Sequence, residues 1–243
     1  MENILPIQIF VISLERSVDR RKRVEEQLNK TNLQWNFLDA VDGYALPQMP
    51  LSYQKSKVKR LQGYELTPGE IGCFLSHIKV WEICLKNNTT TLVFEDDFLV
   101  GENLEVVIED LLSISDHWSL VRLSGIYETN HQILKNRPSY GLVKNLGEPC
   151  GTAAYMIQSA AAKILLENAA DIYEPVDHYL EHYSKHGLHC LAAKPYPIGL
   201  AHTKSTIADR PGRLPVKGWS KTIRSLFRFI DRRTSSSPWF PKT

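Results

Sequence analysis

Three consecutive carboxylates, Glu95, Asp96 and Asp97, follow directly after residues 91–94, a run that is typical of a buried strand. Neighbouring carboxylates repel one another, and burial would favour their protonated form unless a cation compensates the charge. Oxygen ligands of this kind suit Mg²⁺ or Mn²⁺, which complete their coordination with water and with nucleotide phosphates. The alternatives are a solvated acidic turn and an acid pocket of the response-regulator type, although the acids of such pockets come from two separate strand ends. The triplet is therefore the first candidate for a metal and nucleotide site.

The segments around the acidic triplet alternate between strand and helix patterns. Runs of apolar residues, many of them β-branched or aromatic, predict strands at 7–14, 35–43, 89–94, 119–123, 153–157 and 188–194. Helical periodicity predicts helices at 15–30, 67–88 and 159–170. The polar, irregular stretch 46–66 predicts a mobile loop. This alternation favours an α/β fold, with a mostly parallel sheet and helices on both faces. Ligands of such sheets bind outside the carboxyl ends of the strands, where the acidic triplet falls.

The second predicted helix has the clearest start in the chain. Thr67 is suited to the N-cap, Pro68 to the first turn, and Glu70 completes a T-x-x-E capping box. Ser76 and His77 lie on this helix, which leads towards the acidic strand. From the residues alone, a buried histidine with satisfied hydrogen bonds explains His77 as well as a ligand contact does.

The charge distribution argues against a nucleic-acid partner. The chain of 243 residues has a net charge of +2, whereas nucleic-acid binding depends on many phosphate contacts. Basic residues concentrate in the tail at 216–243, which holds seven Lys or Arg residues against Asp231 alone. On a helix, the apolar and aromatic residues of this tail would share one face and the basic residues the opposite one, a pattern typical of peripheral contact with an anionic membrane. Packing on the protein's own core is the alternative.

Composition also indicates the cellular compartment and the number of domains. The cysteines lie among apolar or small neighbours without CxxC spacing, as expected for reduced, buried thiols, and they are Cys73, Cys84, Cys150 and Cys190. The N-terminus has an acid where a signal peptide is basic, and no run approaches the ~20 apolar residues that span a bilayer. We therefore expect one cytoplasmic α/β domain at 1–215, followed by the tail as a possible anchor on the cytosolic face of a membrane.

Four blocks of the sequence, in this order, resemble glycosyltransferase family 25, which includes bacterial lipooligosaccharide galactosyltransferases and collagen galactosyltransferase domains. The blocks are FVISLERSVDRRKRVEEQL, LDAVDG, TPGEIGCFLSHIKVWE running into LVFEDDFL, and EPCGTAAYMIQSAAAKILL followed by PVDHYL. The resemblance covers about residues 5–205 and leaves out the tail. It implies a GT-A type fold, in which a nucleotide-binding sheet holds a UDP-sugar, and an inverting transfer.

The resemblance implies a metal role for the acidic triplet. Glu95, Asp96 and Asp97 correspond to the D-x-D-like motif that holds Mn²⁺ (or Mg²⁺) on the pyrophosphate of the UDP-sugar. Asp97 is the expected direct ligand. Glu95 or Asp96 is expected to face the ribose or the waters of the metal, and Glu95 departs from a strict D-x-D pattern. His202, in GLAHTKS, lies where GT-A enzymes often take a further metal ligand.

Other residues are expected to contact the nucleotide. Arg16 and Arg20 follow the first strand, where guanidinium groups could meet phosphates, although a solvated helix face is the alternative. Asp42, in AVDG, could accept hydrogen bonds from uridine or ribose, although an Asp-Gly turn needs no ligand. The resemblance favours nucleotide-site contacts for Ser76 and His77.

An inverting transfer needs a base that takes the proton of the acceptor hydroxyl from the face opposite UDP. Asp177, in EPVDHY, matches the Pro-x-Asp block of the family and is the first candidate. Glu148, just before CGTAAY, is the second, and if both act, one of them orients sugar or acceptor hydroxyls.

Three histidines recur every four residues and could form a zinc-binding stripe on a helix. A closed zinc site needs four ligands of set geometry, and this segment offers few others. The favoured interpretation is an exposed helix face that carries His178, His182 and His186.

Together these features predict an inverting, metal-dependent glycosyltransferase. It would move a hexose, with galactose from UDP-galactose as first choice, onto a lipid-linked lipooligosaccharide or lipopolysaccharide core at the inner face of the cytoplasmic membrane. The alternatives are a glucosyltransferase of the same pathway, a catalytically silent relative that binds nucleotide or saccharide, and a metal-dependent phosphohydrolase. The complete acidic triplet together with Asp177 argues against the silent relative.

Overall fold

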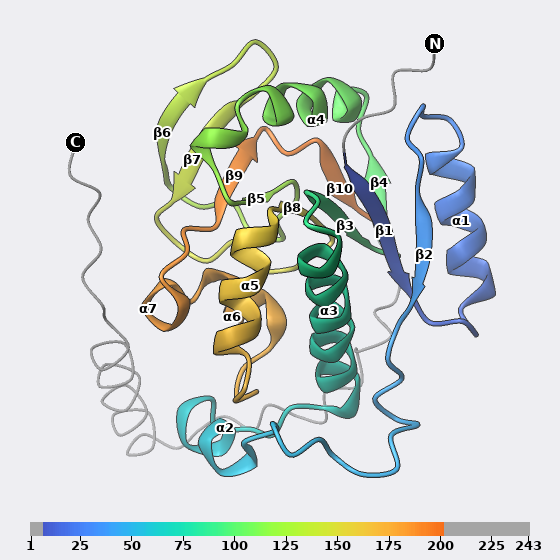
Figure 1. Cartoon of the computed structure of the whole chain (residues 1–243), viewed down its shortest axis with the longest axis vertical. Helices are drawn as coiled ribbons and strands as arrows, with labels where there is room; N and C mark the ends of the chain where they lie inside the picture. Colours follow the sequence, from blue (N-terminus) through green and yellow to red (C-terminus); the bar gives the residue numbers. More distant parts are fainter. Residues whose placement is uncertain (1–6, 202–243) are drawn as a thin grey trace.

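The six runs predicted as strands all take part in one eight-stranded sheet in the computed structural model, which describes residues 7–201 (Figure 1). The order across this sheet is β2-β1-β3-β8-β5-β9-β7-β6. Its strands are β1 (Gln8–Ser13), β2 (Asn36–Asp39), β3 (Thr91–Glu95), β5 (Leu120–Arg122), β6 (His131–Asn136), β7 (Gly141–Asn145), β8 (Ala154–Ile157) and β9 (Leu191–Lys194). A separate pair joins β4 (Phe98–Val100) to β10 (Ile198–Leu200).

The large sheet is mixed, so the prediction of a mostly parallel sheet was wrong. Parallel pairing joins β1 to β2 and to β3, and β5 to β9. The other neighbours are antiparallel, and β8 runs against both β3 and β5. The physical reason is that the connection from β5 to β8 forms the β6–β7 hairpin and contains no helix. The crossover that returns a strand parallel to its predecessor is usually helical.

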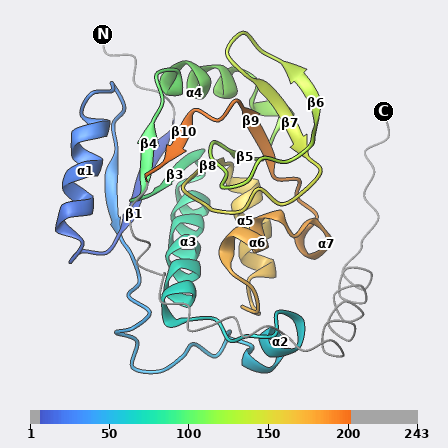
Figure 2. The same ribbon diagram turned by 180° about the vertical axis from the view of Figure 1, so that it is seen from behind.

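Helices cover both faces of the sheet, as predicted (Figures 1 and 2). α1 and α4 pack on one face, and α3, α5 and α6 pack on the other. Successive strand residues point to opposite faces, so Val93 and Phe94 enter different cores. The helices are α1 (Val18–Leu28), α2 (Lys55–Leu61), α3 (Pro68–Asn87), α4 (Leu104–Ser113), α5 (Ser159–Asn168), α6 (Val176–Glu181) and α7 (Tyr183–His186), with a 3₁₀ turn at Ser115–His117.

The capping box of α3 forms as predicted. Thr67 Oγ1 accepts a hydrogen bond from Glu70 N at 3.1 Å, and Glu70 Oε2 accepts one from Thr67 N at 2.8 Å. A cap of this kind stabilises a helix by about 1 kcal/mol. At the other end Asn88 takes the left-handed conformation that commonly ends helices. The start of α3 is thereby fixed, which matters because a loop of the site rests on it.

The loop after β2 packs directly on the first turns of α3 because both contact points are glycines. A Cβ on Gly43 would lie 1.7 Å from the carbonyl oxygen of the first α3 residue, and one on Gly72 would lie 2.5 Å from Val41 O. A side chain at either position would therefore force the loop off the helix. Ser76 Oγ accepts a hydrogen bond from Val41 N at 2.8 Å and fixes the loop in register with α3.

Several elements were not predicted, among them the helices α2 and α4. The stretch 46–66 is not irregular throughout, because α2 forms within it and buries Val58 and Leu61. A helix of two turns contains too few apolar residues to give a periodic signal, which is why the prediction of a loop was wrong there. α4 was missed as well, although it buries Leu104 and Leu111 against the sheet.

Several sequence-based expectations lie outside the described residues. They concern His202, the tail at 216–243 and the domain boundary that precedes it. Among residues 7–201, no helix combines the length and the apolar character that crossing a membrane requires. All four cysteines are described and are free thiols, and of these Cys84 and Cys190 are buried.

The three regularly spaced histidines form neither a zinc stripe nor an exposed helix face. The helix is interrupted at His182, which caps both α6 and α7, so the three side chains do not share one face. His178 pairs with Glu148, and His182 pairs with Glu174. His186 is buried. The favoured interpretation of an exposed face was therefore wrong, because regular spacing implies a stripe only on an uninterrupted helix.

The buried imidazole of His186 is held in its neutral form. Its Nε2 donates to Tyr179 O at 2.9 Å, and its Nδ1 accepts from Leu188 N at 3.1 Å. A second proton on Nδ1 would remove the latter bond. Burial lowers the pKa of His186 to about 4.

This histidine should make the protein less stable in mild acid. Between pH 7 and pH 5 the imidazole gains a proton in the unfolded chain but not in the folded one, which should cost about 2 kcal/mol. We expect His186→Gln to remove that part of the pH dependence, as measured by urea unfolding at the two pH values. The exposed His117→Gln is the matched control, and an unchanged pH dependence in His186→Gln would contradict the prediction.

Candidate active site

The acidic triplet lies where β3 ends and turns into β4. Glu95 is the last residue of β3, and Asp96 and Asp97 form the turn. β1 runs parallel to β3, with Ile12 opposite Glu95, so Ser13 lies beside the triplet. The site is therefore at the shared carboxyl edge of two central strands, as the sequence predicts.

Asp96 is held by partners from β1 and α1. Its Oδ2 accepts a hydrogen bond from Ser13 Oγ at 2.6 Å, and its Oδ1 forms an ion pair with Arg20 Nη1. Both side chains of the pair are largely buried, with exposed fractions of 12% for Arg20 and 9% for Asp96. In this conformation Asp96 orients Arg20 and is itself neutralised.

Glu95 ends a chain of hydrogen bonds that starts in the core. Trp81 Nε1 donates to the Tyr155 hydroxyl at 2.9 Å, which lies 2.8 Å from His77 Nδ1. His77 Nε2 lies 3.2 Å from Glu95 Oε1, which also accepts a hydrogen bond from Thr152. Burial opposes ionisation of Glu95, but the bonds from His77 and Thr152 hold its pKa below the usual value.

Asp97 has no such compensation. Its Oδ1 is buried and has no hydrogen-bond partner. Burial and the neighbouring Glu95 charge raise the pKa of Asp97 to about 7, although Arg20 acts in the opposite direction. An unpartnered buried carboxylate oxygen beside two further acids is the environment that a divalent cation would complete. The residues present therefore fit a bound Mg²⁺ or Mn²⁺.

A small cavity of about 130 Å³ brings most of the predicted donor residues together. Arg16 and Arg20 line it from the start of α1, and Asp42 lines it from the loop after β2. An ion pair joins Arg16 to Asp42. The remaining predicted residues in its walls are Ser76, Glu95, Asp96 and Asp97.

Two of the predicted nucleotide contacts, Ser76 and His77, are hydrogen-bonded to other groups of the protein. Ser76 Oγ donates to Gly72 O at 2.7 Å while it accepts from Val41, so its role in this structure is to fix the loop. His77 is fully buried and does not line the cavity. Any influence of His77 on a bound nucleotide would pass through Glu95.

The two candidate bases lie next to this cavity, on residues that precede β8 and begin α6. Asp177 accepts hydrogen bonds from Gly151 N and His178 N, each at 3.0 Å. Glu148 Oε2 lies 3.3 Å from His178 Nδ1, and this contact raises the pKa of the imidazole. Gly151 has a φ of +71°, which glycine adopts without strain.

The bases and the acidic triplet belong to one site. Burial raises the pKa of the Cys73 thiol well above its usual value, and the charges of Glu95, Asp177 and Asp97 add to this effect. Cys73 Sγ lies 3.9 Å from Glu95 Oε1, and Cys73 also lines the small cavity. The segment 148–152 links the two parts, because Gly151 binds Asp177 and the next residue, Thr152, binds Glu95.

One residue type in the sequence could have drawn attention to the segment 148–152. Arg122 is a charged residue in the apolar run 119–123, and it is fully buried in β5. It forms an ion pair with Glu181 and donates to the carbonyl oxygens of Cys150 and Gly151. A cation in a predicted core strand implies buried acceptors, and here those acceptors hold the site loop in place.

Two groups of described side chains have ligand atoms close enough to share a metal ion. One is Cys73, His77 and Glu95, and in each group these atoms lie within 4.8 Å of one another. The other consists of Glu148, Cys150 and His178. Asp97 belongs to neither group, so its candidacy rests on its own unpartnered oxygen and on the cavity that it lines.

Comparison with known proteins places this geometry in a family context. The family model described as "Glycosyltransferase family 25 (LPS biosynthesis protein)" matches residues 6–180. "Inactive glycosyltransferase 25 family member 3" of Homo sapiens is 31% identical over 90% of this chain and 43% of its own length. "Procollagen galactosyltransferase 1-A" of Xenopus laevis is 32% identical over 74% of this chain and 31% of its own.

A bacterial relative is similar over a somewhat shorter part of this chain. "Lipooligosaccharide biosynthesis protein lic2B" of Haemophilus influenzae is 29% identical over 64% of this chain and 61% of its own length. The chain spans about half the length of the first curated relatives that it matches. The family model covers most of the described residues, including the acidic triplet and both candidate bases. The chain therefore belongs to glycosyltransferase family 25.

Proposed function

We propose that this protein is an inverting, metal-dependent glycosyltransferase of GT-A type that moves galactose from UDP-galactose onto a lipooligosaccharide or lipopolysaccharide core. The observation that carries the proposal is the uncompensated Asp97 carboxylate in a cavity that Arg16 and Arg20 also line. The names of the Xenopus and Haemophilus relatives support galactose as the donor sugar and lipooligosaccharide as the acceptor class. Glucose is the alternative donor sugar.

Asp97 would hold Mn²⁺ (or Mg²⁺), with Glu95 next to it and with His202 as a further candidate ligand outside the described residues. When bound, the cation stabilises the negative charge that grows on the leaving nucleoside diphosphate. Arg16 and Arg20 supply fixed positive charge at the same cavity. Asp42 and Asp96 would face the nucleoside, and each is already oriented by one of these arginines.

The transfer itself would be a single displacement at the anomeric carbon. The acceptor oxygen forms a bond to C1 of the hexose while the bond from C1 to the β-phosphate oxygen breaks, and UDP leaves with that electron pair. The proton of the acceptor hydroxyl passes to a carboxylate base. We assign the base to Asp177, which two backbone N–H groups orient, and we assign Glu148 to the acceptor hydroxyls.

A catalytically silent binding protein is the second candidate. It is favoured by one observation, the human relative that is named inactive. Such a protein would bind nucleotide or saccharide at the same cavity without turnover. For either function, we propose peripheral attachment to the inner face of the cytoplasmic membrane through the basic residues of 216–243.

Donor turnover separates the two candidates. In the presence of Mn²⁺ and without an acceptor, we expect slow hydrolysis of UDP-galactose or UDP-glucose, because water can replace the acceptor. Asp97→Ala should lower this rate at least 100-fold, and a chelator should have the same effect. Released UDP is the measured product, and a panel of UDP-sugars identifies the donor. Nucleotide binding by calorimetry without any turnover would favour the silent protein, and full activity in chelator would contradict the metal.

Removal of the Asp97 charge should stabilise the metal-free protein. Its carboxylate is ionised at pH 8 although burial and Glu95 oppose that charge, so Asp97→Asn should relieve about 1 kcal/mol, equivalent to ~2–4 °C in Tm. Asp96→Asn is the matched control, and it should lower Tm because it breaks the ion pair with Arg20. Mn²⁺ should raise the Tm of the wild type but not of Asp97→Asn. A lower Tm for metal-free Asp97→Asn would argue against the uncompensated charge.

The assignment of the base predicts different losses at the two acids. Asp177→Asn should reduce kcat for donor hydrolysis by about 100-fold or more, the usual contribution of a general base, while UDP affinity stays within twofold. Glu148→Gln should reduce kcat less than tenfold. Steady-state kinetics and UDP calorimetry provide the two readouts, and the reverse order of the losses would transfer the role to Glu148.

A further inference from the structure

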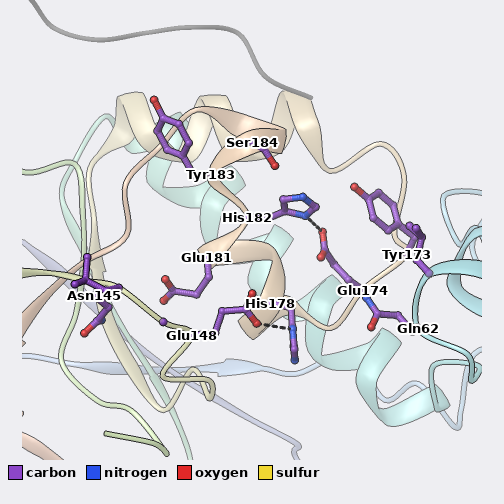
Figure 3. A pocket seen from close by; sticks show the side chains of 13 residues that line it. Gln62, Asn145, Glu148, Tyr173, Glu174, His178, Glu181, His182, Tyr183 and Ser184 are labelled. Carbon is purple, nitrogen blue, oxygen red and sulfur yellow. Dashed lines mark hydrogen bonds and ion pairs between the residues drawn. The ribbon is translucent and has the colours of Figure 1, made fainter. Parts of the chain in front are cut away.

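A second and larger cavity, of about 760 Å³, opens beside Glu148, the second candidate base (Figure 3). Its walls come from α2, from the end of β7 and the following residues, and from the α6–α7 region. Its volume lies within the range of ~300–1,000 Å³ that is typical of sites for small ligands. Apart from the bases, the side chains that matter below are Gln62, Tyr173, Glu174, His182, Tyr183 and Ser184.

The position of this cavity relates it to the proposed reaction. Glu148 and His178 line the cavity, and the latter is the immediate neighbour of Asp177. On the other side, the segment 148–152 reaches Glu95 through Thr152. The segment 148–152 therefore connects Glu95, which lines the small cavity, to the wall of the larger one. A group bound in the larger cavity would contact Glu148 and His178.

Carboxylates line both cavities, but the two differ in whether Lys or Arg side chains stand beside them. Arginines line the small cavity, whereas no Lys or Arg is among the described residues that line the larger one. Its charged side chains are three carboxylates, and of these Glu181 is paired with the buried Arg122. Lys57 and Lys185 are close, but their ammonium groups lie over the ring of Tyr173, 3.6 and 4.0 Å from its centroid.

Two carboxylate–imidazole pairs face this cavity (Figure 3). Glu174 Oε1 lies 2.7 Å from His182 Nδ1, and the Glu174 side chain is only 6% exposed. Glu148 forms the second pair with His178. Such pairs offer acceptors and donors together, which suits the hydroxyl groups of a sugar. A phosphate or carboxylate placed there would meet the carboxylates of these pairs without a Lys or Arg among the described lining residues.

We propose that the larger cavity binds the acceptor and selects an uncharged, hydroxyl-rich sugar as the unit that is glycosylated, against a phosphorylated one. Glu174 and His182 are the specificity-determining pair, because they are fixed to each other and face the cavity away from the reacting atoms. The inference rests on the proposed function, since it takes Glu148 and Asp177 as the groups that meet the acceptor hydroxyl.

The proposal can be tested by ligand-observed NMR with the full chain, with and without UDP and Mn²⁺. The probes are methyl β-galactoside, methyl β-glucoside and lactose, together with galactose 6-phosphate and glucose 6-phosphate. We expect at least one neutral probe to bind at least tenfold more tightly than both phosphates. Equal or tighter binding of a phosphate, or no binding of any neutral probe under either condition, would overturn the proposal.

Variants locate the binding in this cavity. Glu174→Gln should weaken binding of the neutral probe about fivefold or more, as expected for loss of a charged hydrogen-bond acceptor. Glu167→Gln, which changes an exposed glutamate on α5, should leave it unchanged. Ser184→Arg adds a cation to the cavity wall and should raise the affinity for the phosphates relative to the neutral probe at least fivefold. Unchanged binding in a folded Glu174→Gln, or an unchanged ratio in Ser184→Arg, would overturn the proposal.

Donor hydrolysis measured on the same samples distinguishes a failure of the acceptor cavity from a failure of the proposed glycosyltransferase function. Glu167→Gln changes neither cavity, so this control should hydrolyse the UDP-sugar within twofold of the wild type. Normal hydrolysis with no change in probe binding would overturn the acceptor cavity alone. Absence of hydrolysis in the wild type would instead count against the proposed function.

Discussion

The structure concentrates three carboxylates in one partly buried turn, and this electrostatic constraint organises everything around it. Charge of one sign cannot gather in a medium of low polarity unless each group is compensated. Asp96 is neutralised by Arg20, and Glu95 is stabilised by His77 and Thr152. Of these three acids, only Asp97 has a buried carboxylate oxygen without a hydrogen-bond partner. The site therefore lacks a compensating charge at Asp97, and the proposed divalent cation would supply it.

The fold provides this arrangement by bringing distant segments to one sheet edge. Parallel β1 and β3 place Ser13 beside the acids, and α1 returns Arg20 to the same edge. The insertion of antiparallel β8 next to β3 brings in Thr152 and the bases that flank it. Buried Arg122 then fixes the loop before β8 through its carbonyl oxygens. The proposed donor and acceptor regions would thus meet at carboxylates that are held by backbone and core contacts.

Sequence reasoning recovered what depends on local pattern and missed what depends on pairing. The six strands, the capping box at Thr67 and the acidic triplet at a strand end followed from periodicity and from residue type. The direction of β8 could not be predicted, because it depends on which neighbours a strand finds and not on its own residues. The part played by Thr152 was missed for the same reason, since nothing in its own segment reveals that Glu95 lies opposite. The histidine spacing misled because one break in a short helix separates side chains that regular spacing would align.

The position of the metal decides whether this account is right. Crystals grown with UDP and Mn²⁺ can be measured at a wavelength where manganese scatters anomalously, which locates the ion independently of the protein atoms. The account predicts one strong anomalous peak that contacts the Asp97 carboxylate and the diphosphate, with the nucleoside towards Asp42. A peak at Glu148, Cys150 and His178 with none at Asp97, or UDP bound away from the β3 turn, would contradict it.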